Sequence, residues 1–143
     1  AQVKGKLEYE TLETQRFVDK HGLHELKWNP YFPLNSLQLM RGLVAAQRSG
    51  VADKYIEVVS AAMWEQGEKL DDAAVIERVL RAGGLDAPAL LAMTQTPEVK
   101  AQLLANTEAA VQRGVFGLPT FFVGTEMFFG KERLGQIEEL LRA

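Results

Sequence analysis

The chain has 143 residues, a formal net charge of −3 and no cysteine. This length is typical of one domain, or of one domain with an insertion, and it suffices for a hydrophobic core. The slight acidity argues against a nucleic-acid-binding protein, and the absence of cysteine excludes thiolate zinc sites and a thiol nucleophile within these residues. No apolar run reaches the roughly 18 residues of a membrane helix, and no signal peptide is recognisable. We therefore expect a cytoplasmic protein with no membrane, nucleic-acid or metal partner.

Most of the sequence predicts helices that end at glycine. Capping residues and apolar residues at helical spacing predict helices over about 4–21 and 37–48, a third whose apolar positions run from 55 to 63, a fourth whose apolar positions run from 75 to 80, a short one from 86, and one over about 97–113. Asn35 or Ser36 is the expected cap of the second helix, and Asp71 or Asp72 that of the fourth. The segment Trp28–Pro33 carries two prolines, which favour extended geometry at the residues before them.

The sequence pattern changes after Gly114. Thr120–Val123 and Met127–Phe129 are aromatic-rich and predict two short strands, joined by a turn and followed by a last amphipathic helix. Consecutive apolar residues in the first strand require burial on both faces, and an isolated hairpin is only marginally stable. Either the hairpin is buried in a helical shell, or it belongs to a sheet whose other strands are not in this chain.

The loop Gly114–Pro119 leads into the first of these strands. Two glycines loosen it, and proline is tolerated at the first position of a strand. A cis bond before Pro119 would turn the backbone of Leu118 outward, where it could pair with an extended peptide. The alternative is a tight turn with no binding role.

Four segments resemble one known family. Gly117–Val123 is similar to the cis-proline loop and strand of DsbA-type thioredoxin-fold proteins. Asn29–Arg41 and Ala62–Asp72 resemble the helical insertion of the 2-hydroxychromene-2-carboxylate isomerases. Phe129–Leu134 resembles the stretch with which that family and the kappa-class glutathione transferases hold the γ-glutamyl end of glutathione.

The resemblance implies an α/β fold that is mostly helical in this chain, a thioredoxin-like domain with a large helical insertion. Residues 1–113 would form the insertion, and residues 114–143 the C-terminal part of the thioredoxin-like domain. The first βαβ unit would be absent from this chain. The family's serine near the glutathione sulfur would lie upstream of Ala1, so no residue here is assigned as catalytic.

The resemblance also implies site residues and a reaction. Leu118, Pro119, Lys131 and Glu132 would bind glutathione as cofactor, and the start of the last helix favours an anionic carboxylate. The family more often has a small polar residue followed by Asp where this chain has Lys131 and Glu132, and a solvated helix start is the alternative for this pair.

Asn35 and Arg41 match family positions near the substrate. The arginine could bind a substrate carboxylate, and a structural ion pair is the alternative. The aromatic residues Trp28, Tyr31, Phe32 and Trp64 would either line an aromatic substrate pocket or belong to the core.

The leading hypothesis is a homodimeric, glutathione-dependent isomerase of the 2-hydroxychromene-2-carboxylate type, which acts on an aromatic pyruvate-like acid. Two alternatives from the same fold are a kappa-class-like glutathione transferase and a DsbA-like thiol-disulfide oxidoreductase, which would need a cysteine pair upstream. A further alternative is a non-catalytic helical module that recruits a partner through the edge of the hairpin.

Overall fold

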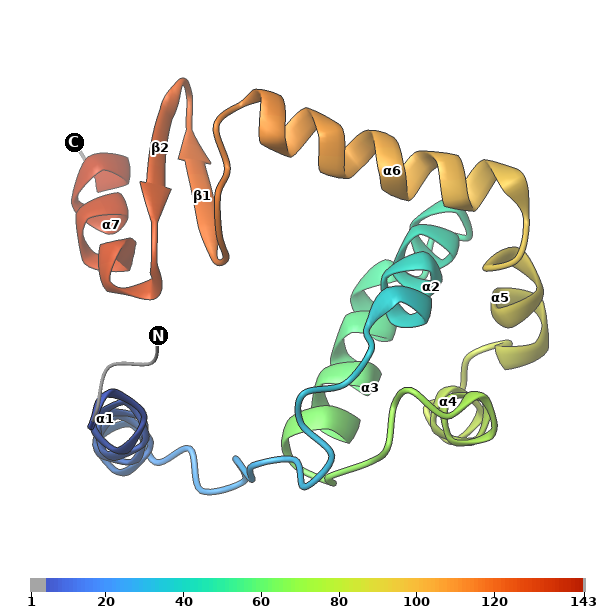
Figure 1. The fold of residues 1–143 in the computed structure, drawn as a ribbon, viewed down its shortest axis with the longest axis horizontal. Coiled ribbons are helices and arrows are strands. Elements are labelled where there is room, and N and C mark those ends of the chain that lie inside the picture. Colours follow the sequence, from blue (N-terminus) through green and yellow to red (C-terminus); the bar gives the residue numbers. More distant parts are fainter. Residues whose placement is uncertain (1–4, 143) are drawn as a thin grey trace. The chain divides into compact units, whose positions relative to one another are not determined.

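The computed structural model describes residues 5–142, which form seven α-helices, one 3-10 helix and one two-stranded sheet (Figure 1). In chain order these are α1 (Lys6–His21), α2 (Leu37–Arg48), α3 (Ala52–Trp64), α4 (Ala73–Ala82), α5 (Ala87–Met93), α6 (Pro97–Gln112), β1 (Thr120–Val123), β2 (Glu126–Phe129), η1 (Lys131–Arg133) and α7 (Leu134–Arg142). All the predicted helices and both strands are present. The predicted start at Lys4 lies outside the described residues, and Glu126 belongs to the second strand rather than to the turn.

Side-chain caps explain where several helices begin. The carboxylate of Asp72 accepts a hydrogen bond from the N–H of Ala74, and that of Asp86 accepts one from Ala89. At α2, the side-chain oxygen of Asn35 accepts from the N–H of Leu37 at 3.1 Å, so Asn35 rather than Ser36 supplies the side-chain cap.

The chain divides into two compact units, Ala1–Lys100 and Ala101–Ala143. In the first unit, α2 contacts α3 and α5, and α4 contacts the same two helices. These helices and the segments beside them hold the buried apolar core, which includes Leu39, Val44, Tyr55, Ala62, Leu70, Ile76, Leu80 and Leu90. The first unit therefore has a hydrophobic core of its own. The boundary predicted after Arg113 from the family resemblance stays a prediction.

The second unit contains the antiparallel hairpin of β1 and β2. Thr120 lies opposite Phe129 and Val123 opposite Glu126, so two residues form the turn, and Gly124 supplies the positive φ of 59° that such turns require. All of β1 is half-buried and most of β2 is exposed, so of the two alternatives for the hairpin, burial in a helical shell is not observed among the described residues. Within residues 5–142, β1 pairs only with β2, and its other edge is free.

None of the helices formed by the described residues combines the length and the apolar character that crossing a membrane requires.

Candidate functional site

The loop before β1 exposes the backbone of Leu118. The Leu118–Pro119 peptide bond is cis, as the resemblance implied, and Leu118 is 86% exposed. The N–H of Gly130 donates to the carbonyl oxygen of Pro119 at 3.0 Å, which extends the β1–β2 ladder by one residue pair. Because hydrogen-bonding direction alternates along an antiparallel strand, the residues of β1 that do not bond to β2 present their backbone groups at its other edge, and Leu118, which precedes the cis bond, makes no bond to β2.

The outward-facing groups of Leu118 are free to bind a ligand. In the part of the chain that the structure describes, neither its N–H nor its C=O has a protein hydrogen-bond partner. By the same alternation, the backbone groups of Thr120 and Phe122 face this edge. An extended peptide-like ligand can therefore add to β1 beginning at Leu118.

Gly117 fixes the shape of this loop. A Cβ atom at position 117 would lie 2.7 Å from the ring of Phe129, so only glycine allows this approach. The ring of Phe116 also contacts Phe129, with ring centroids 4.7 Å apart, and the hydroxyl of Thr120 donates to the carbonyl oxygen of Gly117 at 2.7 Å. Gly117 therefore packs the loop against β2, whereas the sequence predicted that it loosens the loop.

Lys131 and Glu132 follow Gly130, the residue that pairs with Pro119. Their side chains are largely exposed and form an ion pair with each other at 2.5 Å. The hydrogen bond from the Lys131 ammonium lowers the pKa of the Glu132 carboxyl, which therefore stays ionised at neutral pH. The hairpin register thus brings Pro119 and this charged pair to the same end of the sheet, beside the free backbone of Leu118.

Arg41 lies on α2 in the first unit. Its Nε atom is buried and has no hydrogen-bond partner, and its guanidinium forms no ion pair within residues 5–142. The structural ion pair that the sequence left open is therefore not observed among these residues. Asn35 uses its oxygen to cap α2. These two predicted substrate residues belong to the first unit, and the four predicted glutathione residues belong to the second.

Asn29 holds the segment Trp28–Pro33, which is rich in aromatic residues, against the end of α3. Its side chain is 4% exposed, and its amide nitrogen donates to the carbonyl oxygens of Met63 at 3.1 Å and Glu68 at 2.8 Å. Its oxygen accepts from the N–H of Tyr31. Sequence reasoning missed this role. The available signal was a polar residue between Trp28 and the first proline of an aromatic segment.

The aromatic residues of this segment lie outside the core. Trp28, Tyr31 and Phe32 are each about half exposed or more, so of the two alternatives for them, a place in the core is not observed. A cavity of about 300 Å³ opens beside them, and its lining residues are Thr14, Leu26, Trp28 and Trp64.

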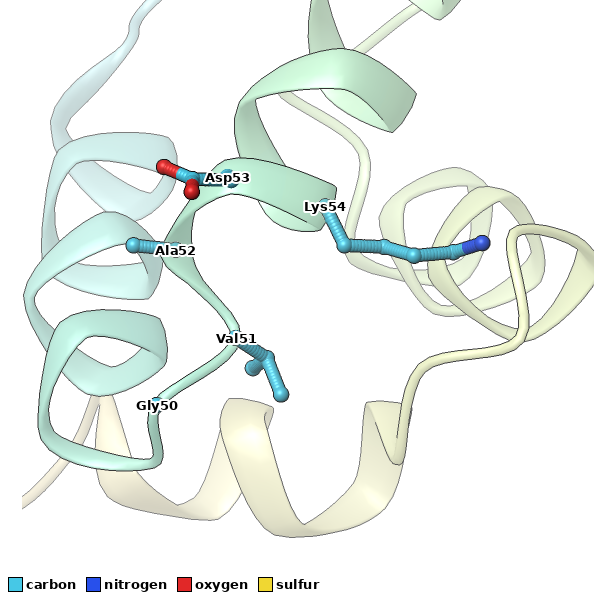
Figure 2. A pocket seen from close by; sticks show the side chains of 5 residues that line it. All are labelled: Gly50, Val51, Ala52, Asp53 and Lys54. Atoms are coloured by element: carbon cyan, nitrogen blue, oxygen red, sulfur yellow. The ribbon is translucent and has the colours of Figure 1, made fainter.

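A second hollow, of about 450 Å³, lies at the start of α3. Five successive residues, Gly50–Lys54, line it, and Figure 2 shows the Lys54 side chain reaching across the opening. Among the described residues no buried polar side chain contributes to this lining, and its two charged residues, Asp53 and Lys54, are exposed.

Several known proteins are similar to this chain in sequence and fold. The model of the DSBA-like thioredoxin domain matches residues 2–142. The chain is 29% identical over 141 residues to the 2-hydroxychromene-2-carboxylate isomerase of Pseudomonas putida, which covers 97% of this chain and 67% of that protein. It is 30% identical over 136 residues to human (Homo sapiens) glutathione S-transferase kappa 1, covering 82% of this chain and 60% of that protein.

A solved structure is also similar. The structure of selenomethionine 2-hydroxychromene-2-carboxylate isomerase superposes with a TM-score of 0.84 at 29% identity, covering 97% of this chain and 67% of that one. The chain thus spans roughly three fifths to two thirds of the length of these relatives. The resemblance and the mostly helical DsbA-like thioredoxin fold inferred from the sequence are confirmed.

Proposed function

Because this chain belongs to the DSBA-like thioredoxin domain family, we propose that it acts as a glutathione-dependent isomerase of the 2-hydroxychromene-2-carboxylate type. The observation that carries the proposal is the likeness, over 97% of the chain, to a protein and to a solved structure of that name. The relatives named above are isomerases and a transferase, which favours a catalytic role over a binding module. The substrate would be an aromatic pyruvate-like acid.

The second unit offers the groups that would hold glutathione. The free N–H and C=O of Leu118 match the donor and acceptor of the cysteinyl peptide unit, beside Pro119. Glu132 would accept hydrogen bonds from the γ-glutamyl ammonium, and Lys131 would bind the adjacent carboxylate, because the two tripeptide charges are opposite to theirs. The existing Lys131–Glu132 pair is exposed, so exchanging it for ligand contacts costs little.

The 143 residues contain no cysteine, and in the proposed reaction glutathione supplies the thiol. Bound glutathione would supply a thiolate that adds reversibly to a conjugated carbon and forms an enolate, which lets the former double bond rotate before the C–S bond breaks and the thiolate leaves. The protein's share is to orient the two reactants. Arg41 suits the substrate carboxylate, because its guanidinium has an unsatisfied, desolvated Nε. Asn35 retains a free amide nitrogen beside the same helix.

The test is isomerisation of a 2-hydroxychromene-2-carboxylate by the purified protein in three solutions. One contains glutathione, one contains S-methylglutathione, and one contains neither. We expect turnover only with glutathione, because the methylated peptide keeps the binding groups and lacks the thiol. Activity undiminished without glutathione would contradict the proposal.

A transferase of the kappa type is the second candidate, because the similarity to the human enzyme extends over 82% of the chain. It predicts glutathione conjugation to an electrophile such as 1-chloro-2,4-dinitrobenzene, with no isomerisation. We further propose that the protein forms a homodimer, as the family resemblance implies. Sedimentation at micromolar concentration tests this, and a monomer would contradict it.

A further inference from the structure

Both tryptophans of the chain line the same cavity. Trp28 and Trp64 face each other edge to face, with ring centroids 6.2 Å apart and an interplanar angle of 84°. Thr14 from α1 and Leu26 complete the lining of the roughly 300 Å³ space. This volume is at the lower end of small-molecule pockets and suits a ligand of one or two rings. All four residues belong to the first unit.

Backbone hydrogen bonds fix the two walls of this cavity relative to each other. The N–H of Lys27, next to Trp28, donates to the carbonyl oxygen of Trp64 at 2.6 Å. On the other side of Trp28, the buried Asn29 donates to the carbonyl oxygen of Met63. Trp28 is therefore held at both of its neighbours to the end of α3. A cavity held in this way binds without a large ordering cost.

The apolar character of the lining, as well as the cavity volume, restricts which ligands can bind. It presents almost no polar surface and no charged side chain. Its one hydroxyl, on Thr14, already donates to the carbonyl oxygen of Glu10 at 2.9 Å. A carboxylate or an ammonium would lose water here with no compensating partner. An aromatic ring gains burial and edge-to-face contact with two indoles, and Trp28, which is 59% exposed, has surface to cover.

We propose that this indole cavity (Thr14, Leu26, Trp28 and Trp64) binds one uncharged aromatic small molecule. The binding needs none of the residues of the second unit, so it does not require the proposed glutathione contacts. An edge-to-face contribution should make an aromatic ring bind about two- to tenfold more tightly than a saturated ring of the same size.

The test uses the emission of the two tryptophans, because both of them line the cavity. The full chain is titrated with benzyl alcohol and, in a separate experiment, with cyclohexylmethanol; both solutions lack glutathione. Fluorescence is excited at a wavelength that tryptophan alone absorbs. We expect a saturable change with benzyl alcohol, with a dissociation constant on the order of 1 mM, and weaker binding of the saturated alcohol. A response without saturation, or equal affinity for the two alcohols, would overturn the proposal.

A variant that fills the cavity gives a second, independent readout. The substitution T14F places a ring in the space and keeps both tryptophans, so benzyl alcohol should no longer bind. The matched control is T107F, because Thr107 makes the same type of hydrogen bond to a helix carbonyl but is exposed in α6. Binding retained in a folded T14F variant, or lost equally in both, would contradict the proposal. The pair of alcohols on the unmodified chain decides the question even if T14F does not fold.

Discussion

The hydroxyl of Tyr55 donates a 3.0 Å hydrogen bond to the carbonyl oxygen of Leu39, which joins α3 to α2 inside the helical unit. Tyr55 is only 2% exposed, and burial raises the pKa of its hydroxyl to about 12. The same side chain lies against Gly42, one turn further along α2 from Leu39. This contact makes the stability of the first unit sensitive both to pH and to a single added methyl group.

The first prediction is a loss of stability between about pH 10 and pH 12. The unfolded chain releases the Tyr55 proton at its ordinary pKa of 10.0, whereas the folded chain holds it to about 12. The contribution of Tyr55 to the free energy of unfolding is therefore complete below pH 10. It falls by about 3 kcal/mol in total as the pH rises from 10 through 12. Urea unfolding at pH 9, 10 and 11 measures it. Y55F should be less stable at pH 9, by about 1 kcal/mol, and should lose this pH dependence.

The control for this experiment is Y9F, since Tyr9 is 59% exposed on α1. It should keep the pH dependence of the unmodified chain. If Y55F and the unmodified chain lose stability in parallel above pH 10, another group is responsible and the role assigned to Tyr55 is wrong.

The second prediction is that G42A destabilises the protein although alanine favours helices. A Cβ atom at position 42 would lie 2.2 Å from the Tyr55 hydroxyl oxygen, so the packed ring must move. We expect a loss of about 1–3 kcal/mol in the free energy of unfolding, measured by urea denaturation. The matched variant is G135A in α7, where nothing lies within 4 Å. It should instead gain about 0.5–1 kcal/mol, and equal effects in the two variants would refute the packing argument.

The third prediction concerns the buried Asn29. In N29D a carboxylate replaces the amide that donates to the carbonyl oxygens of Met63 and Glu68, so these two acceptors lose their donor and face a buried negative charge. We expect the free energy of unfolding to fall by about 3 kcal/mol or more, which a lower melting temperature would show. The control is N106D on the exposed face of α6, where the side-chain oxygen accepts from Gln102 and is retained. That change should stay within about 0.5 kcal/mol.

The helices were predictable because their signals are local. Asp72 caps α4, as predicted, and Asp86 and Thr96 cap α5 and α6 in the same way, through contacts that span two or three residues. The exposure of Trp28 and Phe32 was not predictable in this way. It depends on how Asn29 attaches their segment to α3, a contact between residues more than thirty positions apart. Aromatic composition alone favours the core, and here tertiary hydrogen bonds hold these rings at the surface.

The candidate site shows the same division. The cis-proline motif predicts the outward direction of the Leu118 backbone, whereas the hairpin register, with Glu126 in β2, does not follow from the strand pattern. Whether Arg41 forms an ion pair is not predictable in this way, because no sequence pattern shows whether a carboxylate elsewhere in the first unit reaches its guanidinium. Gly117 is similar. Its contact with Phe129 across the hairpin becomes visible only when both residues are placed.

The fourth prediction tests the proposed glutathione contact. E132Q removes the negative charge that would face the γ-glutamyl ammonium, so we expect about three- to tenfold more glutathione to be needed for half-maximal rate. Because the pKa of Glu132 is lowered, this contact is complete at neutral pH and is lost only as pH falls through that lowered value. The control is E138Q, which breaks a similar exposed ion pair with Arg142 in α7. An equal effect of the two variants would exclude a specific contact.

The fifth prediction separates substrate binding from glutathione binding. R41K keeps the positive charge of Arg41 but loses the planar group that binds a carboxylate through two hydrogen bonds. We expect the KM for the aromatic acid to rise about tenfold, with the KM for glutathione unchanged, since glutathione would be held by residues of the second unit. R48K, at the exposed end of the same helix, is the control and should leave both constants unchanged. A rise in the KM for glutathione, or no difference between R41K and R48K, would show that Arg41 does not hold the substrate carboxylate.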